Sequence, residues 1–80
     1  MNWLEQRIEN RLANWRKIRT NDIQSFAEKR EMLRQIDIEI DLVYEHRNDC
    51  PVKPDIFGGL SNLCLTLTQE ILEIINQKKP

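Results

Sequence analysis

His46 and Cys50 are the residues of the chain best suited to metal binding or nucleophilic chemistry. They lie four positions apart near the expected end of a helix, so their side chains could face the same way. A structural zinc site needs four ligands, and Asp49 and Cys64 would have to complete an irregular set. A catalytic cysteine needs a positioned base and a further group that orients the base. Neither set is complete, so we interpret His46 as an exposed helix-end residue and expect no metal and no cofactor.

Four carboxylates lie close together in the sequence, at Asp37, Glu39, Asp41 and Glu45. A metal site or a general acid–base pair would require their oxygens to converge. On a helix these residues point in different directions and do not converge. They are better suited to an acidic surface that faces a basic partner. We therefore predict that these residues contact a partner protein together with the apolar residues Ile38 and Leu42.

Basic residues gather in the first part of the chain, at Arg7, Arg11, Arg16 and Lys17. Such residues could contact phosphates, and Trp3 could stack on a base. Glu5 and Glu9 dilute the positive charge, and the isoelectric point of about 5.8 is low for a nucleic-acid-binding protein. We interpret this segment as a solvated helix face. A small nucleic-acid-associated regulator that uses the basic segment is the alternative function.

Residues 33–41, Leu-Arg-Gln-Ile-Asp-Ile-Glu-Ile-Asp, faintly resemble the first helix of the all-helical chorismate mutases. In that family Leu-Arg is followed after two residues by Ile-Asp, and then after one residue by a second Ile-Asp. Here the first gap is one residue and the second gap is two. The Lys and Arg that hold a dicarboxylate in such a site have no counterpart in this chain. The resemblance therefore implies no activity here, and we do not expect an enzyme.

Length and composition indicate one small helical domain. The chain has 80 residues, of which 40% are apolar and 31% are charged, and it contains only two glycines and three prolines. A chain this short buries a limited core, and self-association is a common source of additional stability. We expect no signal peptide, no membrane span and no disulfide framework. These features favour a cytoplasmic protein with two free thiols.

The longest segment without glycine or proline, residues 22–47, predicts the central helix. One stripe of about 120° collects its main apolar residues, which are Phe26, Met32, Leu33, Ile36, Ile40, Val43 and Tyr44. Ile38 and Leu42 fall almost opposite this stripe and stack on each other. A helix with two apolar stripes needs neighbours on two sides. We expect one neighbour from the same chain and the other from a second subunit or a different protein.

Residues 36–42 also alternate strictly between apolar and acidic, which is typical of a half-buried strand. Two observations favour the helix. Residues 26–35 are good helix formers that lead into the alternation without a breaker, and the main apolar stripe continues in phase through Val43. A strand over residues 36–44 is the alternative.

Two further helices are expected on either side, at about residues 2–19 and 56–77, with a loop at residues 48–55. Asn21 is the predicted N-cap of the central helix, with Gln24 three residues later, and Asp55 is the predicted cap of the last helix. The last helix has one broad apolar face, from Ile56 to Ile75, and a narrow second stripe at Leu65 and Leu72. We predict an all-α fold, either a three-helix bundle or a helical hairpin plus a third helix, that self-associates as a dimer.

The expected function is non-enzymatic protein binding. Because no groups converge at catalytic spacing, the acidic and apolar face of the central helix is the best candidate for contact with a target. A regulator, an inhibitor or an immunity-type protein would use such a face.

Overall fold

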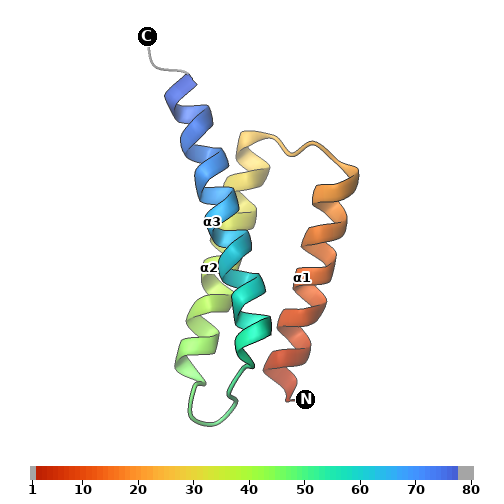
Figure 1. The fold of residues 1–80 in the computed structure, drawn as a ribbon, viewed down its shortest axis with the longest axis vertical. Coiled ribbons are helices and arrows are strands. Elements are labelled where there is room, and N and C mark those ends of the chain that lie inside the picture. The colour runs from red at the N-terminus through yellow and green to blue at the C-terminus, as the bar shows by residue number, and fades with distance from the viewer. Residues whose placement is uncertain (1, 78–80) are drawn as a thin grey trace.

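The computed structural model describes residues 2–77. Three helices follow one another: α1 at Trp3–Asn21, α2 at Phe26–Glu45 and α3 at Pro54–Gln77. Consecutive helices run in opposite directions, and α2 and α3 lie side by side while α1 leans against them (Figure 1). The predicted all-α three-helix bundle is confirmed. Residues 36–44 lie inside the continuous helix α2, so the strand alternative is excluded.

Capping boxes fix the starts of α1 and α2. Asn2 accepts a hydrogen bond from the backbone N–H of Glu5, and the Glu5 carboxylate accepts one from the backbone N–H of Asn2. Ser25 and Glu28 make the same exchange at the start of α2. Each box satisfies two backbone donors that have no partner within the helix.

The prediction that Asn21 caps the central helix is wrong. Asn21 is the last residue of α1, and an extended connection at residues 22–25 precedes α2. Gln24 donates to the carbonyl oxygens of Ile18 and Asp22, so it closes the end of α1 instead of completing a box with Asn21. The reciprocal hydrogen bonds of the capping box are formed by Ser25 and Glu28 and not by Asn21 and Gln24.

The third helix begins earlier than predicted. α2 ends at Glu45, and the connection to α3 runs over residues 46–53. Pro54 is the first residue of α3, where its missing N–H costs no hydrogen bond. Asp55 therefore lies in the first turn of α3 and is not its cap, although its charge still suits the positive end of the helix dipole.

The core lies where the three helices meet, and α2 and α3 share the largest interface. Its buried apolar residues are Leu4, Ile8, Leu12, Trp15, Met32, Ile36, Ile56, Leu60, Leu67 and Ile71. Those of α1 recur at three- or four-residue intervals, which places them on one face of the helix. Burial of this shared face is the main force that holds α1 against the α2–α3 pair.

Glu5 joins α1 to the connection between α2 and α3, and this contact makes the stability of the fold depend on pH. Its Oε2 accepts a hydrogen bond of 3.0 Å from the backbone N–H of Lys53. This hydrogen bond lowers the pKa of Glu5 below its ordinary value of 4.5. A carboxyl whose pKa is lower in the folded state adds stability above the unfolded value, and this stability is lost as the pH falls through the folded value.

We predict that the Tm changes little down to about pH 5 and then falls below about pH 4.5. Glu5→Gln should lower the Tm at neutral pH. On acidification, the Tm of this variant should then fall by less than the Tm of the natural chain. Thermal melts followed by circular dichroism at several pH values measure both effects. Parallel pH profiles for the two proteins would show that Glu5 has no part in the acid response.

Candidate functional site

Glu39 lies inside the molecule, although the sequence suggested an acidic surface. Its side chain is only 1% exposed, and its carboxylate faces α1. Arg7 Nε lies 2.7 Å from Glu39 Oε1, and Arg11 Nε lies 2.9 Å from the same oxygen. The prediction that Glu39 contacts a partner protein is therefore wrong. The physical reason is that two cations from α1 compensate the cost of burying this carboxylate.

The same ion pairs change the interpretation of the basic segment. Arg11 Nη2 also donates to Gln35 Oε1 at 2.8 Å, and the Arg11 guanidinium lies 4.9 Å from the centre of the Trp15 ring. Arg7 and Arg11 are therefore held against α2 and are not spread along a free surface. Of the four residues predicted to contact nucleic acid, Arg16 and Lys17 have no such carboxylate within residues 2–77. The structure thus divides the candidate phosphate-binding segment in two.

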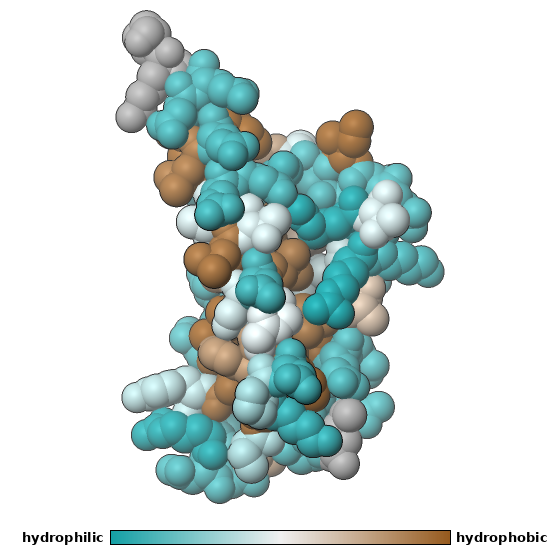
Figure 2. Space-filling model, in the orientation of Figure 1, coloured by the Kyte–Doolittle hydropathy of each residue, from teal (hydrophilic) through white to brown (hydrophobic). Residues whose placement is uncertain are grey.

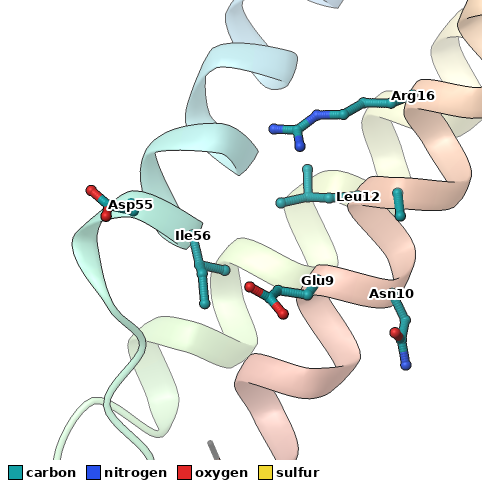
Figure 3. Close-up of a pocket in the computed structure, with 7 residues that line it drawn as sticks. Glu9, Asn10, Leu12, Arg16, Asp55 and Ile56 are labelled. Atoms are coloured by element: carbon teal, nitrogen blue, oxygen red, sulfur yellow. The ribbon is translucent and has the colours of Figure 1, made fainter.

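Arg16 borders a hollow of about 450 Å³ between α1 and the start of α3. Figure 3 shows its side chain extending from α1 toward α3, above Leu12, whereas Asp55 points away from the hollow. Gly59 gives this side chain room, because a Cβ at that position would lie 2.8 Å from Arg16 Nη2. Within residues 2–77, the three charged residues that border the hollow, Glu9, Arg16 and Asp55, form no ion pair with one another.

Three of the predicted partner-binding carboxylates do lie on the surface of α2. Asp37, Asp41 and Glu45 are exposed and follow one another at four-residue intervals, which places them in one row along the helix. We call this row the acidic ridge. Within residues 2–77 no Lys, Arg or His forms an ion pair with any of the three.

The cations that flank the acidic ridge in the sequence, Arg34 and Arg47, make other contacts. Arg34 donates through Nε and Nη2 to the carboxylate of Glu31, and this interaction lowers the pKa of Glu31 to about 2. Arg47 donates to the carbonyl oxygen of Tyr44 at 2.8 Å and lies over its ring, 4.3 Å from the ring centre. Within residues 2–77, neither arginine therefore forms an ion pair with the ridge.

Ile38 and Leu42 occupy different environments. Ile38 is 44% exposed, so its side chain is available to a partner. Leu42 is half-buried and packs against the core. The expectation that Leu42 lies outside the intrachain core is wrong, because α1 and α3 cover two sides of α2. The second neighbour required by the two apolar stripes is thus largely supplied by the same chain.

His46 makes structural contacts at the end of α2. Its Nδ1 lies 3.0 Å from Asp49 Oδ2, and this interaction lowers the pKa of Asp49. The ring also packs against the Trp3 ring in a T-shaped arrangement, with 5.2 Å between ring centres. His46 is therefore half-buried, and its interpretation as an exposed residue is wrong. Among residues 2–77, no three His, Cys, Asp or Glu side chains are grouped so that they could hold a metal ion.

Cys64 lies beside the acidic ridge. Its Sγ is 3.9 Å from Asp37 Oδ1, and burial raises the pKa of the thiol. The protonated thiol can therefore donate weakly to this carboxylate. Cys64 is partly buried and packs against the core.

The sequence interpretation underestimated the exposed apolar surface of α3. Leu65 and Leu72, which form the predicted second stripe, are 61% and 52% exposed, and Ile75, on the predicted apolar face, is 41% exposed. Tyr44 is 67% exposed, although it belongs to the predicted core stripe of α2. It borders an apolar hollow of about 380 Å³ that also includes Phe57 of α3. Phe57 and Leu65 lie within the long uncharged segment from residue 56 to residue 69, which is the sequence signal for this part of the surface.

Comparison of the chain with protein-family models, curated proteins and solved structures gives no match. None of the three helices combines the length and the apolar character needed to cross a membrane. The functional proposal therefore depends on the surface chemistry described above.

Proposed function

We propose that the protein acts without catalysis, by binding another protein through the acidic ridge of α2. The observation that carries this proposal is that Asp37, Asp41 and Glu45 are exposed and have no cationic partner within residues 2–77. Like charges at four-residue intervals on a helix destabilise it by about 0.2–0.5 kcal/mol per pair. A cationic partner would remove this repulsion and gain charge–charge attraction.

The carboxylates that form ion pairs between helices differ from those of the acidic ridge. Glu39 is paired with Arg7 and Arg11. Glu70 is paired with Arg19 at 2.7 Å and with Lys29 at 2.9 Å, and the hydrogen bond from Arg19 lowers the pKa of Glu70. These carboxylates join helices to one another. Within residues 2–77 the acidic ridge makes no ion pair of this kind, which suits it to an external partner.

Two exposed apolar side chains accompany the ridge. Ile38 is 44% exposed and Tyr44 is 67% exposed. Tyr is enriched among the residues that dominate binding energy at protein interfaces. Arg47 lies over the Tyr44 ring, with its guanidinium 4.3 Å from the ring centre. The partner that fits this surface presents Lys or Arg beside apolar residues, and a regulator or inhibitor of such a protein is the functional class that we propose.

Charge reversal provides the test. We expect Asp41→Lys combined with Glu45→Lys to weaken partner binding by tenfold or more, which corresponds to about 1.4 kcal/mol. Glu9→Lys combined with Glu73→Lys makes the same change in net charge at exposed sites outside the ridge. Each immobilised protein is exposed to the same cell lysate at low salt, and the bound proteins are identified and titrated.

The decisive result is a bound protein that the natural chain and the Glu9/Glu73 variant retain and that the ridge variant loses. Its affinity should also fall as the salt concentration rises, because exposed charges are screened. Equal retention by all three proteins, or no specific retention by the natural chain, would contradict the proposal.

A further inference from the structure

The outward side of α3 carries six uncharged residues in a regular pattern: Gly58, Ser61, Leu65, Thr68, Leu72 and Ile75. We call them the α3 seam. Their successive intervals are three, four, three, four and three residues, which is the a/d spacing of a coiled coil. Figure 2 shows hydrophobic side chains along α3 up to its C-terminal half, which extends beyond the α1–α2 connection. Leu65, Leu72 and Ile75 are exposed and Gly58, Ser61 and Thr68 are half-buried, so residues 2–77 leave much of this helix-pairing surface uncovered.

No charged residue belongs to the seam or to its edges. The charged residues within Pro54–Gln77 are Asp55, Glu70 and Glu73, and none is a seam residue or its immediate edge neighbour on a heptad. One edge carries Asn62, Gln69 and Asn76, and the other carries Phe57, Cys64 and Ile71. A charged partner would lose hydration against this surface without gaining an opposite charge. The seam therefore favours an equally uncharged helix.

We propose that the seam pairs with the same seam of a second copy of this chain, with the two α3 helices antiparallel. In this register Gly58 faces Ile75 of the second copy, Ser61 faces its Leu72, and Leu65 faces its Thr68. Every layer then places a small or polar side chain opposite a large one, which lets the two surfaces interdigitate. A parallel pair would instead place Gly58 against Gly58 and Ser61 against Ser61, leaving one end of the interface poorly filled.

The edges of the seam agree with this arrangement. In an antiparallel pair, the edge that carries Asn62, Gln69 and Asn76 lies along the same edge of the second copy. Side-chain amides both donate and accept hydrogen bonds, so the amides of one copy can bond to those of the other. The seam from residue 58 to residue 75 is about 26 Å long at 1.5 Å per residue, which gives six facing layers along the pair. The acidic ridge lies on α2, so this inference is independent of the proposed function.

The first test is the mass in solution. Sedimentation equilibrium of the full chain at about 100 µM should give twice the monomer mass of 9.6 kDa. Leu65→Lys should weaken the dimer at least a hundredfold, because the twofold axis introduces the lysine twice. Ile23→Lys is the matched control, since Ile23 is fully exposed on the connection between α1 and α2. This control should remain dimeric, and circular dichroism should show the same helix content for both variants.

Cysteine cross-linking tests the direction of the pair in a chain that also carries Cys50→Ser and Cys64→Ser. Ser61→Cys mixed with Leu72→Cys should give a disulfide-linked dimer of the two different chains. Neither variant alone should cross-link efficiently. A natural chain that is monomeric at about 100 µM, a Leu65→Lys variant that stays dimeric, or efficient cross-linking of Leu72→Cys with itself would overturn the proposal. None of these results depends on binding at the acidic ridge.

Discussion

A chain that ends at Lys53 is expected to lose cooperative folding. It lacks α3, which contributes Ile56, Leu60, Leu67 and Ile71 to the core. Burying each such side chain contributes about 1.5–3 kcal/mol. The four together contribute roughly 6–12 kcal/mol, comparable with the whole stability of a small domain even when the denatured chain is partly compact. The shortened chain would also leave Arg19 and Lys29 without their shared partner Glu70.

Circular dichroism and thermal melting of the shortened and full-length chains measure this effect. We expect low helix content and a broad, non-cooperative melt for the shortened chain, with helix content restored by adding a peptide of residues 54–80. Within the full chain, Leu67→Ala should cost about 2–5 kcal/mol. Leu65→Ala, at an exposed site, should cost far less when it is measured at low protein concentration. A cooperative melt of the shortened chain at a similar temperature would show that α1 and α2 form a stable unit alone.

Combined replacement of Arg7 and Arg11 by Met should destabilise the fold by about 3–5 kcal/mol. The two changes leave the Glu39 carboxylate, which is 1% exposed, without either of its cations. A buried charge without a partner costs far more than the net stabilisation of the original ion pairs. Met preserves much of the length and apolar surface of the Arg side chains, so the loss of packing is small. Urea unfolding at neutral pH, compared with that of the natural chain, gives the change in free energy.

The addition of Glu39→Leu to the same variant should recover most of the lost stability, because it removes the unpaired charge and fills the space with apolar atoms. Arg16→Met combined with Lys17→Met is the matched control. It removes the same charge from exposed residues of α1 that form no ion pair within residues 2–77. A triple variant that is as unstable as the double variant would show that the arginines stabilise the bundle by another route.

The sequence by itself determined the helices and most of the core. In α1, apolar side chains at intervals of three and four residues mark the buried face, with Leu4, Ile8 and Leu12 among its members. The interval depends only on the geometry of a single helix, so it can be recognised without knowing the neighbours. The helix starts were less certain, since Asn21 and Ser25 both have side chains suited to capping. Which of them caps α2 depends on the reach of Gln24 and Glu28 in three dimensions.

Only the tertiary structure decided which polar and apolar residues remain available to a partner. Glu39 and Asp41 are both acidic residues of α2, yet one faces α1 and the other faces solvent. That difference depends on where Arg7 lies, 32 residues away in the sequence. Leu42 and Leu65 differ in the same way, because neighbouring helices cover the first and leave the second exposed. Local periodicity describes the faces of each helix, whereas long-range packing determines which faces are paired, because charge neutralisation and burial both require contact between distant segments.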